Sequence, residues 1–330
     1  MGAEVAALVA GPQLMLERIA RRSNRSLAGR VAVLCAVFGL FLVSAVWFGA
    51  DPLPRSAWHE LGLASDSLAL RRVYARDAEA LDGIFTENDF HLAALRSGED
   101  FGVPRLSVTA LPRDMGESKD SDARKALFLR SLLPLVLQAN ADLRLARSKV
   151  MTALDAQAAG RLSATDSLWL EEVTRWYGAE PGDAADLLSR IDTVPPSLAL
   201  AQAAQESGWG TSRFALNANA LFGQRSWGKS ADGLAPKDAD RKDFKVRRFP
   251  DLMSAVRSYL HNLNTHRAYQ DLRARRARAR TLGMPVHALD LVRGLKSYSE
   301  EGGAYVAALG DLIDSNDLLA LDSASLREGR

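Results

Sequence analysis

The sequence has 330 residues, enough for about two domains and a sizeable core, and its 47% hydrophobic and 25% charged residues exclude wholesale disorder or a collagen-like repeat. The net charge is +2. Residues 1–50 contain five Arg and two Glu and so carry +3, whereas residues 51–330 carry −1. Such a balance argues against a nucleic-acid partner, because that affinity depends on neutralising phosphates.

Residues 1–30 are predicted to form a cytoplasmic tail, and Val31–Ala50 a transmembrane anchor. The anchor segment has 20 residues, no charge and only Ser44 as a polar side chain. A helix of this length covers roughly 30 Å, the thickness of the hydrocarbon core. Five arginines precede it, and only Arg55 follows within 20 residues. The positive-inside rule therefore predicts that residues 1–30 stay in the cytoplasm and that residues 51–330 lie on the opposite side of the membrane.

A cleaved signal peptide is the alternative interpretation of this segment. Signal peptides have a shorter apolar run of about 7–15 residues, although Val43–Ala45 and Phe48–Ala50 offer small-residue cleavage sites. We favour an uncleaved anchor. The single cysteine, Cys35, lies within it, which excludes a disulfide framework and a cysteine zinc site. The exported part is therefore expected to depend on packing alone.

Residues 51–120 are predicted to be a periplasmic tether with modest local structure, because Pro and Gly interrupt its apolar patches. Helical patterns begin at Ser121, where Asp122 is a candidate cap and Pro134 a candidate kink. A second helix is expected from Thr165 or Asp166 up to Gly178, and a third from Pro195-Pro196 up to Gly208.

The remaining pattern predicts one small β element and one further strong helix. Asp243–Phe249 alternates apolar and basic side chains, as a short strand or ribbon does. Asp251 caps an amphipathic helix with apolar residues at i, i+3, i+4, i+7 and i+8. The basic run Arg273–Arg280 is interpreted as a solvated helix surface, with an anionic partner as the alternative. The predicted fold is mainly α with a small β ribbon.

Glu206 is the candidate catalytic acid. It stands in the last turn before Gly208, where the partial negative charge of a helix end disfavours a carboxylate and raises its pKa. Trp209 is expected to shield it with an apolar ring. A carboxyl that stays protonated near neutral pH can act as a general acid. Taken alone, such a glutamate is more often a solvated side chain.

The sequence around Glu206 is far more specific. Pro195–Gln224 reads PPSLALAQAAQESGWGTSRFALNANALFGQ. It resembles the core of the peptidoglycan β-N-acetylglucosaminidases of glycoside hydrolase family 73, in which A-x-x-E-S-x-W-G is followed by N-x-L-F-G. The likeness extends over about Ser121–Asn316. The stretch NTHRAYQDLR at Asn264–Arg273 is similar to one branch, the Bax proteins of Gram-negative bacteria.

The resemblance implies a lysozyme-like glucosaminidase domain at residues 121–330. Within it, Glu206 matches the catalytic acid and Tyr298 a tyrosine close to the reacting sugar. Ser207 and Gly210 match the turn that positions the acid. The residues expected to bind substrate are Ser207, Trp209, Asn219, Phe222, Gly223 and Trp227. Core packing is the alternative for Trp209 and Phe222, and it is the favoured interpretation for Tyr305.

The second carboxylate departs from the family pattern. Glycosidases normally use two carboxyl groups. The interval in which the family places the second one offers Asp232, Asp238, Asp240 and Asp243 here, and no Glu. We choose Asp243 first and Asp240 second. No metal or organic cofactor is implied, and His261 and His266 are interpreted as core or surface histidines.

The expected function is therefore a membrane-anchored periplasmic peptidoglycan hydrolase, an endo-β-N-acetylglucosaminidase that cleaves the GlcNAc-β-1,4-MurNAc bond. Its expected partners are glycan strands and the inner membrane, the latter through Val31–Ala50. Two alternatives stay open. One is a lytic transglycosylase, which shares the lysozyme-like core and leaves an anhydro-sugar end. The other is a non-catalytic glycan-binding or regulatory protein. The sequence indicates no particular protein partner.

Overall fold

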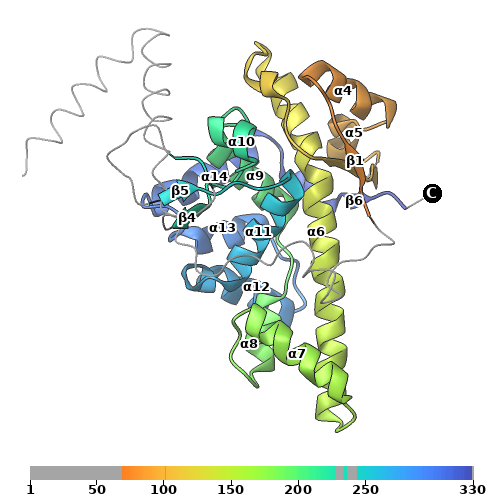
Figure 1. Cartoon of the computed structure of the whole chain (residues 1–330), viewed down its shortest axis with the longest axis vertical. Helices are drawn as coiled ribbons and strands as arrows, with labels where there is room; N and C mark the ends of the chain where they lie inside the picture. Colours follow the sequence, from red (N-terminus) through yellow and green to blue (C-terminus); the bar gives the residue numbers. More distant parts are fainter. Residues whose placement is uncertain (1–68, 101, 228–232, 236–243, 329–330) are drawn as a thin grey trace, which may run out of the picture. The chain divides into compact units, whose positions relative to one another are not determined.

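The computed structural model describes residues 69–100, 102–227, 233–235 and 244–328 (Figure 1). All of them belong to one of the two units into which the chain divides, residues 45–330. The predicted tail at residues 1–30 and the predicted anchor at 31–50 lie outside the described residues.

The long helix α6 (Ser121–Ala158) is the centre of the fold, and it runs roughly 57 Å with other elements beside it along its length (Figure 1). It is capped by Asp120, which accepts from the backbone N–H of Asp122 and Ala123, rather than by Asp122 as predicted. The helix continues through Pro134, and every residue from Leu127 to Asn140 is buried.

Among the described residues, α6 is the one helix long and apolar enough to cross a membrane. Its most apolar stretch is 89% buried within the fold. Helices and strands from both ends of the chain pack against that stretch. We therefore interpret α6 as the core helix of the domain, and it gives no information about the predicted anchor.

The described part of the predicted tether is folded. It forms β1 (Arg71–Val73), α4 (Ala78–Glu87), α5 (Leu92–Ser97), β2 (Gly102–Val103), β3 (Leu106–Val108) and a 3₁₀ turn, η3 (Arg113–Gly116). Leu81 and Phe85 of α4 are fully buried in the same core as Phe128 of α6. Arg130 of α6 pairs with Asp82 of α4. The packed domain therefore extends to the N-terminal side of residue 120.

The next helices include three predicted ones, α7 (Ala164–Trp176), α9 (Pro196–Ser207) and, after the ribbon, α11 (Leu252–Thr265). Two short ones that were not predicted are α8 (Ala184–Arg190) and α10 (Arg213–Ala218). α7 begins at Ala164, just before the predicted start at Thr165 or Asp166, and its cap is Ser163. Asp251 caps α11 as predicted, because its side chain accepts from the backbone N–H of Ser254.

The predicted ribbon is confirmed as two antiparallel strands, β4 (Arg225–Trp227) and β5 (Phe244–Val246). Trp227 lies opposite Phe244 in their register. Leu234 adds a further antiparallel bridge to Val246. Together with the predominance of helices, this ribbon confirms the predicted mainly α fold with a small β element.

The chain closes with α12 (Gln270–Thr281), α13 (Ala288–Val292), α14 (Gly303–Ser315) and β6 (Ser325–Leu326). Short 3₁₀ turns lie among them: η4 (Arg267–Tyr269), η5 (Arg293–Leu295) and η6 (Leu319–Ser323). β6 pairs in parallel with β2, and β1 pairs in parallel with β3. The last described strand is therefore joined to the N-terminal elements of the domain.

The interpretation of the basic run as a solvated surface is wrong for Arg273 and Arg276, which are buried, and holds for Arg278 and Arg280, which are exposed. Arg276 is 0% exposed. Its guanidinium donates to the backbone carbonyls of Ser189, Asp192 and Thr193 and to Asn264 Oδ1. Arg280 donates to both carboxyl oxygens of Asp192. These arginines are structural cross-links, whereas Arg278 is exposed as predicted.

Candidate active site

Helix α9 carries Glu206 in its last turn. Ala201, Ala203 and Ala204 are buried on this helix, so neighbouring elements approach it closely. Gly208 ends it in the left-handed conformation with φ 59°, as the sequence predicts. At the other end, Asp322 accepts from the backbone N–H of Ser197 at 2.7 Å. The position of Glu206 is therefore set by contacts at both ends of α9.

The turn after α9 is held by Ser207. Its hydroxyl donates to the carbonyl of Ala203 at 2.6 Å and accepts from the N–H of Gly210 at 2.8 Å. Gly210 has φ 78°, and a Cβ added there would lie 2.5 Å from a methyl carbon of Leu111. Ser207 is 0% exposed. Because Ser207 is buried, it cannot contact the substrate directly, and its role is to hold the turn.

The two oxygens of the Glu206 carboxyl have different surroundings. Oε1 accepts a hydrogen bond from the hydroxyl of Tyr305 at 2.9 Å. Oε2 lies next to Gly223, where an added Cβ would be 3.5 Å away. Gly223 has φ 66°, which favours glycine. The residue as a whole is half-buried. One oxygen is therefore tied to the interior, while the other lies beside a residue without a side chain.

Buried aromatic rings form the wall behind this carboxyl. Phe222 stacks on Tyr259 with centroids 3.9 Å apart, and Tyr298 stacks on Tyr305 with centroids 5.3 Å apart. Burial raises the pKa of Tyr259, Tyr298 and Tyr305 well above their usual range, and the charge of Glu206 adds to the effect. Their hydroxyls are therefore neutral donors near physiological pH.

Tyr298 does not reach the surface. It is 0% exposed, and its hydroxyl donates to the carbonyl of Phe222 at 3.2 Å. Phe222 itself is 1% exposed and packed on Tyr259. The expected sugar contact of Tyr298 and the expected groove contact of the Phe222 ring are therefore corrected. Both side chains lie behind the N-x-L-F-G loop, where they support it.

Two of the expected substrate-binding residues are partly exposed near this loop. Asn219 ends α10 in the left-handed conformation with φ 53°, and its amide donates to the carbonyl of Phe249 at 3.0 Å. Trp209 has φ 57°, and its ring packs edge-on against Phe128 of α6, with Lys125 over its face. The described ring contacts of Trp209 are thus to α6, so the expected shielding of Glu206 by this ring stays a prediction.

Part of the predicted site lies outside the described residues. Asp240 and Asp243, the two choices for a second carboxylate, lie in this undescribed part, as do Asp232 and Asp238. Trp227 is described only by its backbone, in β4. The second carboxylate therefore stays a prediction.

Sequence reasoning missed the partners of Glu206. Tyr305 was interpreted as a core residue, yet its buried hydroxyl binds the carboxyl. Gln202 and Tyr259, which continue the hydrogen bonds inward, were not singled out. The one signal in the sequence was that Gln202 precedes Glu206 by four residues, which places both on one face of α9.

His261 is buried among rings rather than placed at the candidate site. It stacks on Trp176 with centroids 4.8 Å apart. Burial lowers the pKa of His261 to about 4, so the imidazole is neutral in the fold. The interpretation of this residue as a core histidine agrees with its surroundings.

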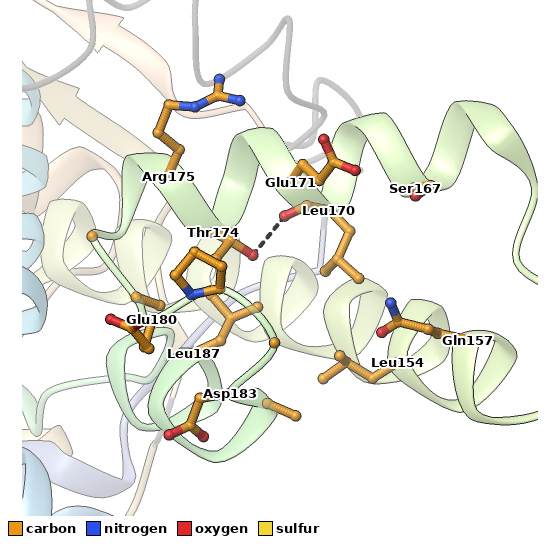
Figure 2. Close-up of a pocket in the computed structure, with 15 residues that line it drawn as sticks. Leu154, Gln157, Ser167, Leu170, Glu171, Thr174, Arg175, Glu180, Asp183 and Leu187 are labelled. Atoms are coloured by element: carbon orange, nitrogen blue, oxygen red, sulfur yellow. Dashed lines mark hydrogen bonds between the residues drawn. The ribbon is translucent and has the colours of Figure 1, made fainter.

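A separate cavity of about 660 Å³ lies between the end of α6, α7 and α8 (Figure 2). Leu154, Leu170 and Leu187 form its apolar part, and Glu171 and Asp183 stand at its edge. None of the residues that line it is a predicted site residue. We therefore place the candidate active site at Glu206 and not in this cavity.

Comparison with known proteins identifies the family of the chain. Residues 182–318 match the glucosaminidase family, described as mannosyl-glycoprotein endo-beta-N-acetylglucosaminidase. This range contains Glu206, Gly223 and Tyr305. The chain belongs to the glucosaminidase family.

Within that family the chain is of the Bax type. It is 31% identical over 229 residues to Protein bax of Escherichia coli (strain K12), which covers 68% of this chain and 80% of that protein. No solved structure matches the chain. The resemblance deduced from the motifs is thus confirmed, and the chain is a glycosidase-like protein related to peptidoglycan.

Proposed function

We propose that this protein hydrolyses peptidoglycan as an endo-β-N-acetylglucosaminidase, with Glu206 as the general acid. The observation that carries the proposal is the half-buried Glu206 carboxyl, whose Oε1 is held by Tyr305 and whose Oε2 lies beside Gly223. Membership of the glucosaminidase family supports a glycan substrate.

In this reaction Glu206 donates its proton to the oxygen between N-acetylglucosamine and N-acetylmuramic acid. The bond from that oxygen to the anomeric carbon then breaks, and water adds to the positively charged carbon. The C-terminal end of α9 carries partial negative charge, which favours the protonated carboxyl before the reaction. We propose that Asp243, or else Asp240, activates the water or stabilises the positive charge.

The residues around the acid would share two tasks. Gly223, Asn219, Trp209 and Trp227 would line the groove, where an aromatic ring and an amide suit the apolar faces and polar rim of a sugar. Ser207, Phe222 and Tyr298 would act as positioning residues behind it, because all three are buried. This division follows from burial and differs from the sequence expectation only in moving the last three away from the substrate.

We also propose that Val31–Ala50 anchors the protein in the inner membrane, with residues 1–30 in the cytoplasm and the catalytic domain in the periplasm. The 20 uncharged residues and the five preceding arginines support this orientation. Leu40→Arg tests the anchor, since an arginine in the middle of a span costs about 3 kcal/mol. We expect this variant to leave the membrane fraction, whereas Ser121→Arg stays there. Retention of both variants would contradict the anchor.

The activity is tested with the full-length protein in detergent on purified sacculi, followed by mass spectrometry of the products. We expect reducing N-acetylglucosamine ends, and a loss of at least about 100-fold in Glu206→Gln. Glu172→Gln, at an exposed glutamate of α7, is the matched control.

Three outcomes would contradict the proposal. Full hydrolysis by Glu206→Gln would show that Glu206 is not the general acid. Anhydro-muramic ends would indicate a lytic transglycosylase. Binding of sacculi without any cleavage by the wild type would indicate a glycan-binding protein.

A further inference from the structure

We propose that Gln202 is a positioning residue that orients a one-way chain of hydrogen bonds, Tyr259 to Gln202 to Tyr305 to Glu206, so that Oε1 of Glu206 is always an acceptor and Oε2 carries the proton. The inference rests on the proposed role of Glu206. It adds two residues that sequence reasoning did not select, and it assigns different tasks to the two oxygens of one carboxyl.

The chain consists of three hydrogen bonds. The hydroxyl of Tyr259 donates to Gln202 Oε1 at 2.6 Å. Gln202 Nε2 donates to the hydroxyl oxygen of Tyr305 at 3.0 Å. The hydroxyl of Tyr305 donates to Glu206 Oε1 at 2.9 Å. Each step begins at a donor and ends at an acceptor, and the last acceptor is the candidate catalytic acid.

The amide of Gln202 determines the direction. Its Nε2 has only protons to offer, so the Tyr305 oxygen has to accept from it and keeps its single proton for another partner. That partner is Glu206 Oε1. An amide turned the other way would present an oxygen to Tyr305 and draw the proton away from Glu206. In the structure the amide has the first orientation, in which its oxygen accepts from the hydroxyl of Tyr259.

Burial makes the chain rigid. Gln202 is 0% exposed, and Tyr259 and Tyr305 are each 1% exposed. A buried polar group that loses its partner is destabilised by the full loss of solvation, so each member depends on the next. The members come from α9, α11 and α14, and the chain therefore links three helices around the carboxyl.

The consequence concerns the oxygen that faces the substrate. Because Oε1 already accepts from Tyr305, the proton of the neutral acid resides on Oε2. Oε2 is the oxygen next to Gly223, where an added Cβ would lie 3.5 Å from it. The buried chain therefore places the transferable proton on the side of the N-x-L-F-G loop.

The first test measures the ionisation of Glu206 without turnover. Carbodiimide labels protonated carboxyls, and peptide mass spectrometry of the full-length protein follows the labelling of Glu206 against pH. A donated hydrogen bond favours the ionised carboxyl. We therefore expect the midpoint for Tyr305→Phe to move to higher pH by about one unit. Gln202→Met should move it in the same direction by a smaller amount.

The matched control is Tyr269→Phe. Tyr269 is a buried tyrosine of the same aromatic cluster, with its ring centroid 5.7 Å from that of Tyr298, and it is not one of the members of the hydrogen-bond chain. We expect this variant to leave the midpoint unchanged. Thermal melting of each variant shows that it is folded. An unmoved midpoint in folded Tyr305→Phe would overturn the inference.

The second test measures kinetics on peptidoglycan fragments. Tyr305→Phe should lower kcat about tenfold with little change in KM, and should move the alkaline limb of the kcat/KM profile to higher pH. Gln202→Met should lower kcat less. The double variant should be no slower than Tyr305→Phe, because Gln202 acts through Tyr305. Losses that multiply in the double variant would contradict the chain.

The two tests separate this inference from the proposed function. Labelling midpoints that shift in the variants as expected, together with a wild type that never cleaves peptidoglycan, would refute the hydrolase and leave the hydrogen-bond chain standing. The wild type could instead be active and depend on Glu206, while the variants neither shift the labelling nor lower kcat. That result would refute the hydrogen-bond chain and leave the hydrolase standing.

Discussion

The hydroxyl of Tyr298 donates to the backbone carbonyl of Phe222, 76 residues earlier in the chain, at 3.2 Å. This bond joins the turn before α14 to the N-x-L-F-G loop beside Glu206. We expect Tyr298→Phe to lower the free energy of unfolding by about 1–2 kcal/mol, because it leaves a buried carbonyl without its donor. It should also lower the rate of hydrolysis, because the loop that carries Gly223 loses a support. Urea denaturation and product analysis measure the two effects.

Tyr177→Phe is the control for that substitution. Tyr177 is also a fully buried tyrosine, but its hydroxyl has no hydrogen-bond partner among the residues that the structure describes. We expect its removal to leave stability unchanged or slightly higher, with no effect on hydrolysis. Equal losses in both variants would mean that the Tyr298 bond contributes nothing specific.

Gly210 is expected to tolerate no side chain. In Gly210→Ala the new Cβ would meet Leu111 at 2.5 Å and Phe128 at 2.9 Å, and the backbone is left-handed as well. We expect a loss of about 2–4 kcal/mol from the two effects together. Gly160→Ala separates them, because Gly160 has φ 63° and open space around it, so its loss should be about 1 kcal/mol. Similar melting temperatures for the two variants would contradict the close packing.

Arg276 is expected to be essential for folding rather than for an anionic partner. Arg276→Met leaves the carbonyls of Ser189, Asp192 and Thr193 without their buried donor. It also removes a buried positive charge 3.8 Å from the Asp192 carboxyl, which keeps its hydrogen bonds from Arg280. Removal of one partner from a buried charged network costs about 3–5 kcal/mol. Arg278→Met, on the exposed face of the same helix, should change stability by about 0.5 kcal/mol or less. Denaturation curves of the two variants measure the difference.

The stability of the fold should depend on pH through His261. Burial lowers the pKa of His261 to about 4, against about 6.5 in the unfolded chain, so the fold binds fewer protons than the unfolded state between these values. Stability is therefore complete above pH 6.5 and falls as the pH drops. We expect the free energy of unfolding of the wild type to fall by about 2 kcal/mol between pH 7 and pH 5 because of His261. The variant His261→Gln should not show this fall.

Urea denaturation of the wild type and of His261→Gln, at pH 7 and at pH 5, measures the contribution of His261 to stability. Burial raises the pKa of Asp192, but the hydrogen bond from Arg280 and the charges of Arg276, Arg280 and Arg147 together lower it below its usual value. The stabilisation by Asp192 is therefore lost only below about pH 4. The same pH dependence in wild type and His261→Gln would contradict the buried neutral imidazole.

The elements that the sequence predicted well are those with local causes. The start of α9 at its proline pair, its end at Gly208 and the Asp251 cap of α11 each depend on side chains within a few residues. Glu206 was selected because its motif is a continuous string. The cap of α6 lies two residues before the predicted one, and α7 begins just before its predicted start, because several side chains able to cap stand close together in the sequence.

The features that the sequence did not predict depend on distant partners. Tyr305 binds Glu206 across 99 positions, so no local pattern links them. The burial of Arg276 depends on carbonyls more than 80 positions away. α4 and α5 resemble a tether in composition, but α4 packs against α6 and α5 against η6, both of which are distant in the sequence.

The contact between Asp322 and Ser197 gives the far end of the chain a part in the chemistry. Asp322 holds the first turn of α9 with both carboxyl oxygens, and four residues later the chain pairs with β2. A twelve-residue helix is stiff, so a pull on its first turn displaces Glu206 at its last. A fusion partner or a protease cut near residue 322 should therefore weaken catalysis before it unfolds the domain, and purification tags are better placed at the other terminus.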